Sequence, residues 1–470
     1  MRNLFIGSTL VAVLALGMLA LTEHDSNDNS QSTKSNFNLA YPSICFAPDA
    51  SQDYVEEIYS GLRTPDVGLF QLATRWAATA SSGGGLQQGD PTIITWSIVP
   101  DGTIINAVPS IPSEVTGPSD LVSWLNTLYP GGQNEWLPLF EEIFDRWSAI
   151  SGMTYVYEPN DDGAAMPFPG VSSGAPGLVG VRGDVRISGH RVDGNSNVLA
   201  YNYFPDTGDM VIDTDDNFYN DLSNNSLKMR NVLSHEHGHG MGFSHVCPIT
   251  RTKLMEPFAT TFFDGPQHDD TLAVNRGYGD RFEHNDATGT ATGLGSLGEG
   301  TTMIDTVSLD STSDQDFYSF QISESMTLSM DLSPIGFSYL EGPQNPDGSC
   351  TPGTNFNSLL LSNPAFQILD GGGGVLATAN ANPAGQMESV TDVSLDSAGT
   401  YYIRVYTAPG ADDNVQLYEF DFTLATAGIP CVYGEVLTAW NNPDVVSCLG
   451  SGISILEILD AIDQGLVTPP

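Results

Sequence analysis

Lysine and arginine are scarce in this sequence: it has 15 of them in 470 residues, against 57 aspartates and glutamates, and the formal net charge is -42 at pH 7. A surface of that sign repels the phosphates of nucleic acids and the headgroups of anionic membranes. The charge therefore argues against nucleic-acid binding and favours divalent cations as ligands. Solubility in a saline medium is the simpler interpretation of the surface as a whole.

Long apolar runs are missing after residue 21. The one such run, Leu4 to Leu21, follows Met1-Arg2-Asn3 and resembles a secretory signal with a positive start and an apolar core. We expect a signal peptide at 1–21 and a secreted, extracellular protein. The cleavage pattern offers only Ala20, so an uncleaved membrane anchor is the alternative. The sequence gives no oligomeric state.

The segment after the signal, 22–38, is rich in Ser, Asn and Asp and has few apolar residues, as in a disordered linker. Helical spacing of apolar residues follows between Asp53 and Ala80. We interpret residues 22–88 as a linker and an N-terminal segment or propeptide.

Histidine is scarce as well, with 8 residues, yet four of them lie in the stretch His-Glu-His-Gly-His-Gly-Met-Gly-Phe-Ser-His at 235–245. Positions four apart share one face of a helix, so His235 and His239 can bind one metal ion. Gly242 can end the helix and let the chain return with His245. Three nitrogen ligands leave the fourth position of tetrahedral Zn²⁺ to water, which predicts one catalytic zinc.

Glu236 lies beside these ligands and is the candidate general base for the zinc-bound water. His237 points away from the face of His235 and His239, and we predict a solvated side chain for it.

The pattern HExxHxxGxxH resembles that of the metzincin metallopeptidases, which also carry a methionine turn under the metal. Met255, in Leu254-Met255-Glu256-Pro257, supplies that turn. The resemblance implies a zinc-dependent endopeptidase that hydrolyses peptide bonds of extracellular proteins. Val246, the residue after the third histidine, fits neither the Glu of the astacins nor the Ser or Thr of the matrixins.

The region 89–280 reads as a mixed α/β (α+β) catalytic domain. We expect strands at 92–99, 153–158, 183–187 and 198–203, a helix at 136–150 and the zinc helix at 222–241, from their apolar periodicities.

Two segments before the zinc helix, 193–200 and 208–216, resemble the calcium loop, the substrate edge strand and the second acidic cluster of the matrixins. The resemblance implies a structural Ca²⁺, which prefers oxygen ligands. By position, the implied ligands are Asp193, Gly194, Ser196, Val198, Asp213 and Asp216.

The matrixin pattern also implies a substrate groove and a second, structural zinc. An extended peptide would pair along the edge strand at Leu199 and Ala200, with Pro257 and Phe258 at the specificity pocket. The histidines of the second zinc are replaced by Tyr201 and Val211, and His190 alone does not make a closed site. We predict no second zinc.

Residues 281–426 change to short strands between Gly and Asp turns, which is β-sandwich patterning. The segments 314–320, 366–370 and 399–405 resemble the bacterial pre-peptidase C-terminal domain. Such a domain either takes part in substrate binding or is a passive module. The single glycine run 371–374 lacks the repeated GGxGxD of calcium-binding β-rolls.

Cysteine is sparse: the exported chain has five, which suggests disulfides with one thiol left over. We expect Cys431 to pair with Cys448 in the tail, 427–470. Cys45, in Ile44-Cys45-Phe46-Ala47-Pro48-Asp49, resembles the matrixin propeptide cysteine that caps the zinc, but its usual Arg and Gly neighbours are replaced. We favour a disulfide between Cys45 and Cys247 over that switch.

Two function classes remain at this stage. The first is a secreted zinc endopeptidase that acts on extended peptide or protein substrates. The second is a catalytically idle adhesion or binding protein that keeps the fold. The intact Glu236 favours the first, because a decayed enzyme commonly loses its base first.

Overall fold

The computed structural model describes residues 42–62, 69–166 and 177–426. All of them belong to one compact unit. The predicted signal peptide and the Cys431–Cys448 pair lie outside the described residues. Among the described residues, no helix is long and apolar enough to cross a membrane.

The first half of the chain builds a six-stranded sheet in the order β1-β9-β10-β8-β4-β7. Its strands are β1 Ser43–Phe46, β4 Thr92–Ile98, β7 Met153–Tyr157, β8 Val185–His190, β9 Val198–Asn202 and β10 Met210–Asp213. Strands β7, β4, β8 and β10 run parallel to one another, and β9 is antiparallel to β10. Pairs of short strands lie outside this sheet, at β2 Ala78–Thr79 with β3 Gly83–Gly84 and at β5 Ile104–Ile105 with β6 Gly117–Pro118.

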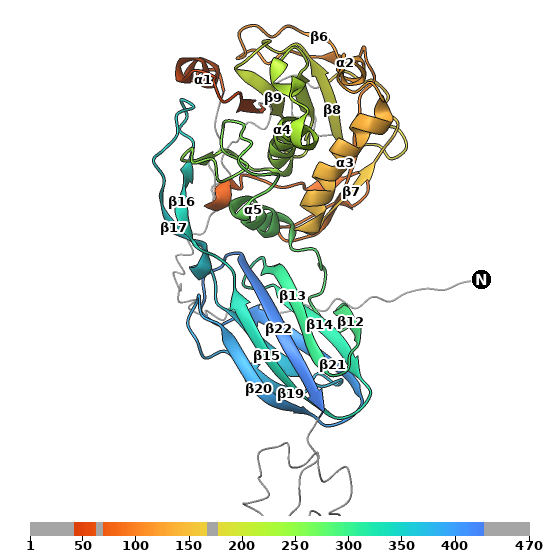
Figure 1. The fold of residues 1–470 in the computed structure, drawn as a ribbon, viewed down its shortest axis with the longest axis vertical. Helices are drawn as coiled ribbons and strands as arrows, with labels where there is room; N and C mark the ends of the chain where they lie inside the picture. Colours follow the sequence, from red (N-terminus) through yellow and green to blue (C-terminus); the bar gives the residue numbers. More distant parts are fainter. Residues whose placement is uncertain (1–41, 63–68, 167–176, 427–470) are drawn as a thin grey trace, which may run out of the picture. The chain divides into compact units, whose positions relative to one another are not determined.

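Successive residues of the sheet face opposite sides, and two hydrophobic cores result. Met210 and Ile212 face the core formed with the long helices, whereas Val211 faces a second core formed with α1. The helices of this half are α1 Gln52–Tyr59, α2 Leu121–Leu128, α3 Gln133–Ala149, α4 Ser223–Met241 and α5 His268–Tyr278, with 3-10 turns η1 Leu69–Gln71 and η2 Asn217–Asn220. Helices α3 and α4 pack against each other and against the sheet (Figure 1).

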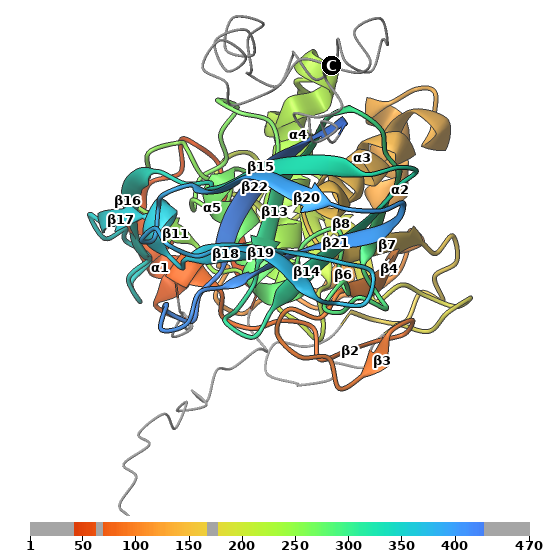
Figure 2. The ribbon, with the colours of Figure 1, turned by 90° about the horizontal axis from the view of Figure 1, so that it is seen from below.

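The second half is a β-sandwich, as the sequence predicts. One sheet has the order β12-β14-β21-β18-β19 and the other β13-β22-β15-β20, and Figure 2 shows the two layers face to face. Their bounds are β12 Thr292–Ser296, β13 Gly300–Leu309, β14 Gln315–Ile322, β15 Met326–Pro334, β18 Pro364–Leu369, β19 Val375–Ala379, β20 Glu388–Leu395, β21 Gly399–Thr407 and β22 Gln416–Thr426. Alternate residues of β22, namely Tyr418, Phe420, Phe422 and Leu424, fill the space between the sheets.

A hairpin is inserted between β15 and β18. It consists of β16 Ser338–Pro343 and β17 Thr354–Asn357, followed by the 3-10 turn η3 Ser358–Leu360. Strand β16 pairs antiparallel with β11, Val246–Cys247, which directly follows the histidine motif. This insertion was not predicted, because its pairing partner lies about one hundred residues away in the chain.

The predicted strands and helices of the catalytic region are confirmed to within three residues at each end. The helix that apolar spacing predicts after residue 53 is only partly confirmed. Helix α1 ends at Tyr59, and Phe70 has a left-handed φ of 58°. Phe70 and Trp76 are buried in the main core from extended and turn segments, so their spacing reflects tertiary contacts and not a helix.

Candidate active site

Helix α4 carries the first two histidines one turn apart. Gly238 lies between them, and a Cβ there would come within 2.3 Å of the sulfur of Met255. Only glycine allows this approach, so the predicted methionine turn packs directly against the backbone between His235 and His239. Met255 is buried, as a side chain under a metal centre has to be.

Gly242 ends α4 in the left-handed region, at φ 107°, and its N–H bonds to the carbonyls of Gly238 and His239. A Cβ at this position would lie 2.0 Å from the carbonyl oxygen of Thr74. Glycine is therefore required both by the backbone conformation and by the close approach. The turn reverses the chain and brings His245 back to the helix.

The three histidines converge through their Nε2 atoms. The separations are 3.0 Å between His235 and His239, 3.2 Å between His239 and His245 and 3.3 Å between His235 and His245. A tetrahedral zinc with bonds of about 2.0–2.1 Å separates its ligand nitrogens by about 3.3 Å, so this set fits the ion.

Burial keeps the three imidazoles neutral, which is the form that binds a metal. It lowers the pKa of His235 to about 4 and that of His245 to about 3. The pKa of His239 falls well below its usual value, through burial and then through the neighbouring imidazoles.

Glu236 is fully buried next to this centre, and neither carboxylate oxygen has a hydrogen-bond partner among the described residues. The backbone N–H of Cys45 lies near this carboxylate but does not form a hydrogen bond with it. Burial raises the pKa of Glu236 well above its usual range, so the carboxylate has a high affinity for a proton.

In each of the three histidines that would bind zinc, the Nδ1 atom faces an oxygen. His235 faces the carbonyl of Leu254 at 2.7 Å, and His239 that of Phe243 at 2.6 Å. His245 faces Oε1 of Gln344 at 2.8 Å and the hydroxyl of Tyr59 at 3.1 Å. The sequence analysis missed Gln344 and Tyr59, because they lie 99 and 186 residues from His245 and no local pattern marks them.

The prediction for His237 is wrong. Its side chain is fully buried, hydrogen-bonds through Nε2 to the hydroxyl of Tyr155 at 2.6 Å and packs against the ring of Phe144. Helix α4 is covered on this side too, by α3 and β7, so the face opposite the metal ligands is not solvated.

The predicted edge strand β9 is not at the edge of the sheet. Strand β1 pairs antiparallel with it, and Cys45 lies opposite Ala200. On its other side β1 bonds to the segment after the methionine turn: Phe46 N–H donates to Pro257 O at 3.0 Å, and Ala259 N–H donates to Phe46 O at 2.9 Å. The predicted groove is therefore a slot between two backbone segments, and residues 43–46 fill it.

The side chains of this slot are apolar. Phe46 packs on Phe258 and Tyr59, with ring centroids 5.9 Å and 6.3 Å away. Leu199 and Ala200 are fully buried under β1. The groove residues predicted from the sequence thus meet one peptide segment, and that segment belongs to this chain.

The predicted Cys45–Cys247 disulfide is wrong. Cys247 bonds to Cys350, and Cys45 is a free, buried thiol. Its sulfur lies within 4.8 Å of ligand atoms of His235 and Glu236. Burial, and then the charge of Glu236, raises the pKa of the thiol well above its usual value.

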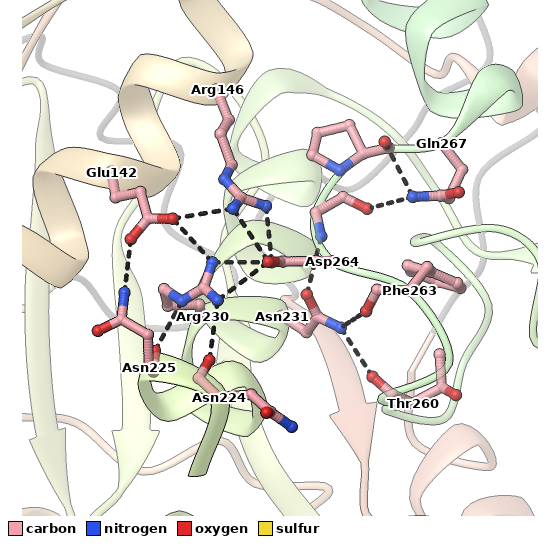
Figure 3. Close-up of polar contacts among 12 residues, drawn as sticks. Glu142, Arg146, Asn224, Asn225, Arg230, Asn231, Thr260, Phe263, Asp264 and Gln267 are labelled. Atoms are coloured by element: carbon pink, nitrogen blue, oxygen red, sulfur yellow. Dashed lines mark hydrogen bonds and ion pairs between the residues drawn. The ribbon is translucent and has the colours of Figure 1, made fainter. Parts of the chain in front are cut away.

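The segment 257–265 follows the methionine turn and forms one wall of the slot, and this wall loop is anchored to α4. Asn231 Nδ2 donates to the carbonyls of Thr260 and Phe263, each at 2.8 Å, and its Oδ1 accepts from Gly265 N–H at 2.9 Å. The preceding residue, the buried Arg230, pairs with Asp264 and Glu142, and Arg146 of α3 pairs with the same two acids. Figure 3 shows the network, which ties α3, α4 and the wall loop together.

The proposed calcium loop, 193–198, folds over the carboxylate of Asp213. Asp213 accepts from the N–H groups of Asp193 and Gly194 at 2.9 and 2.7 Å, and Ser196 has a left-handed φ of 68°. One oxygen each of Asp193 and Asp216 is buried without a partner among the described residues. Burial raises their pKa values to about 7 and about 6. Buried oxygens that lack a donor fit a hard cation.

The positions of the second, structural zinc hold other contacts. Glu114 accepts from the hydroxyl of Tyr201 and lies 2.8 Å from Nε2 of His190, so His190 belongs to a hydrogen-bonded cluster. Val211 is part of the apolar core on that face.

A second acidic group, which the sequence analysis missed, lies at the start of the sandwich. The carboxylates of Glu283, Asp314 and Asp316 lie within 4.8 Å of one another, and each has an oxygen without a partner among the described residues. Burial, followed by the charge of Asp314 and other nearby acids, raises the pKa of Glu283 to about 10. These side chains could hold a cation, and their spacing of about thirty residues hid them from motif analysis.

Comparisons with known proteins agree with this two-part architecture. Residues 133–279 match the matrixin family model, and residues 314–407 match the model of the bacterial pre-peptidase C-terminal domain. The chain thus contains a matrixin domain followed by an all-β pre-peptidase C-terminal domain. None of the curated proteins matches it.

Two solved structures are similar to parts of this chain. The pre-peptidase C-terminal domain of a collagenase from Bacillus anthracis is 14% identical over 28% of this chain and 94% of that one, with a TM-score of 0.18. The periplasmic g-type lysozyme inhibitor PliG of Aeromonas hydrophila is 12% identical over 29% of this chain and 97% of that one, with a TM-score of 0.19.

Proposed function

We propose that this protein is a secreted zinc endopeptidase that hydrolyses peptide bonds of extracellular proteins. The observation that carries the proposal is the convergence of three neutral imidazoles, with Nε2 atoms 3.0 to 3.3 Å apart, beside a buried carboxylate that lacks a donor. His235, His239 and His245 would hold the ion. When bound there, zinc supplies a Lewis acid that polarises a carbonyl and acidifies water.

Glu236 has the role of proton carrier in this proposal. Its buried carboxylate has no hydrogen-bond donor among the described residues and can take a proton from the attacking water. The same carboxyl can then donate the proton to the amide nitrogen that leaves. The backbone N–H of Cys45 near this carboxylate supports a peptide nitrogen at that place. Its burial excludes bulk water as a competing proton donor.

Substrate recognition in this proposal uses main-chain pairing. The slot offers backbone partners on both sides, from β9 and from residues 257–259, and β1 shows that a four-residue extended segment fits between them. Pairing of this kind gives affinity from peptide length, and Phe258, on which Phe46 packs, would add preference for a large apolar side chain.

A structural calcium belongs to the same proposal. Asp193, Asp213 and Asp216 would supply carboxylates, and Gly194, Ser196 and Val198 would supply carbonyls. The partnerless oxygens of Asp193 and Asp216 support it. The ion would fix the loop that enters β9 and with it one side of the slot.

The second candidate function is a binding protein that keeps the fold without catalysis. The filled slot favours it, because in this arrangement the histidines and Glu236 are all buried. Cleavage of a complex peptide library by the full-length protein, before and after mild proteolysis and with and without chelator, distinguishes the two. The endopeptidase requires chelator-sensitive cleavage in at least one condition.

The variant that tests the mechanism is Glu236→Ala. It should keep one zinc per chain and lose about 10² to 10⁴ in cleavage rate, because the ligands remain and the proton carrier is gone. His239→Ala should instead lose the zinc. Cleavage by Glu236→Ala within about threefold of the parent would refute the role of this residue.

A further inference from the structure

His245, the third candidate zinc ligand, differs from the other two in the group that orients its imidazole. His235 and His239 face carbonyls 19 and 4 residues away, on the backbone of the same domain. His245 faces a side-chain oxygen, Oε1 of Gln344, in the hairpin inserted in the sandwich. The orientation of this ligand thus depends on the second domain.

The contacts of Gln344 fix which of its atoms faces His245. Its Nε2 donates to the carbonyl of Gly348 at 2.8 Å. A carbonyl can only accept, so the amide oxygen is the atom that faces the imidazole. Nδ1 of His245 must then carry the hydrogen, which leaves the lone pair of Nε2 for a metal.

The hairpin that carries Gln344 is attached to the ligand segment by covalent and backbone bonds. Val246 and Cys247 pair with Pro343 and Gly342, the residues just before Gln344. The disulfide from Cys247 to Cys350 closes the other side of the hairpin tip. Gln344 is therefore held from both sides, two residues or fewer from the pairing and six from the cross-link.

Two polar contacts fasten the hairpin to the catalytic domain further down. Glu341 accepts from Gln71, and Tyr339 donates to Asp269 at the start of α5. Gln344 and Glu341 are both largely buried. The hairpin is thus packed as a part of the catalytic domain, although the chain reaches it only after β15 of the sandwich.

We infer that Gln344 is a positioning residue of the metal centre, and that residues 338–357 of the second domain complete the catalytic site. This inference rests on the proposed zinc site. It implies that the sandwich is neither a passive module nor removable without weakening the metal centre. Tyr59 also contacts Nδ1 of His245, but it belongs to the N-terminal segment, so Gln344 is the acceptor that remains if that segment leaves.

The test is the zinc affinity of the full chain, measured by competition with a chromophoric chelator. Gln344→Leu removes the acceptor at similar volume and should weaken zinc binding by about 10- to 100-fold. Gln344→Glu keeps an acceptor toward His245 and should bind zinc at least about tenfold more tightly than the leucine variant. Asn345→Ala, which changes the neighbouring residue at the same tip, should stay within about threefold of the parent.

A second variant, which leaves Gln344 in place, serves as the control for misfolding. The double variant Cys247→Ser, Cys350→Ser releases the tip and should also weaken zinc binding, while far-ultraviolet circular dichroism of the zinc-free protein shows the native secondary structure. A leucine variant that binds zinc like the parent overturns the inference, and so does a glutamate variant that is as weak as leucine.

The readout separates this inference from the proposed function. If the parent binds zinc and leucine weakens it, but no peptide is cleaved, the positioning role stands and the endopeptidase proposal fails. If the parent cleaves peptides and the leucine variant keeps full zinc affinity, the endopeptidase proposal stands and the positioning role fails.

Discussion

Cys45 lies opposite Ala200 in an antiparallel pair, so the strand that the sequence predicts for substrate already has a peptide partner from its own chain. The other edge of that peptide is bonded to Pro257 and Ala259. A substrate needs the same backbone groups, so it competes directly with residues 43–46.

The full-length protein is therefore expected to be latent. Phe46→Asp places a charge against Phe258 and Tyr59, and burial of an unpaired charge costs several kcal/mol, so the segment should leave the slot. Peptide cleavage should rise by about tenfold or more, because each 1.4 kcal/mol shifts the closed population tenfold. Gln52→Ala, an exposed change in the same segment, is the control.

Cys45→Ser separates two causes of this latency. If backbone pairing closes the slot, the serine variant stays as inactive as the parent. If the thiol caps the metal, the serine variant becomes active without any change at Phe46. A parent that cleaves as fast as Phe46→Asp would contradict latency altogether.

Calcium should raise the melting temperature of the chelated, zinc-reloaded protein, because a ligand that binds only the folded state adds RT ln(1 + [L]/Kd) to its stability. The double variant Asp193→Asn, Asp216→Asn should lose a part of this rise. The matched variant Asp314→Asn, Asp316→Asn, in the second acidic group, should retain that part. A calcium response that survives unchanged in the first variant would exclude the loop at 193–198 as its origin.

The contribution of Asp269 to the free energy of unfolding should fall as pH rises from about 4 to 7. Burial, and then the charge of Asp270, raises the pKa of Asp269 to about 7. The folded state therefore keeps a proton on Asp269 that the unfolded chain has released above about pH 4, and this favours unfolding as pH increases. The contribution of this carboxyl is of the order of 1–4 kcal/mol.

Asp269→Asn should flatten a part of that pH dependence in urea unfolding at pH 5 and pH 7.5. Asp412→Asn, at an exposed position, should leave the slope as it is in the parent. An identical slope in the parent and in Asp269→Asn would show that this carboxyl is already ionised in the folded protein.

Asn231→Leu should damage the wall of the slot without touching the metal ligands. It leaves two carbonyls and one N–H of the wall loop without their partner, at a cost of about 1–3 kcal/mol for each buried group. We expect a KM increase larger than the kcat decrease, with zinc content unchanged, in steady-state kinetics on one peptide. Asn220→Ala, at an exposed position, should match the parent. Loss of zinc from Asn231→Leu would show instead that the whole helix moves.

The sequence by itself determined the local parts of this protein. The histidine spacing, Gly242 and Met255 predict a metal centre, because helix periodicity and turn conformation are properties of a few neighbouring residues. The short strands between Gly and Asp turns likewise predict the sandwich.

Tertiary structure alone decided what surrounds those parts. The partner of Cys247, the burial of His237, the acceptor for His245 and the peptide in the slot all depend on residues that meet from distant places in the chain. Pairing of that kind is selected by the packing of the whole fold, so no local pattern records it. The spacing of the ligands in the sequence makes them recognisable. Their orientation and their accessibility depend on contacts between distant residues, which only the folded chain contains.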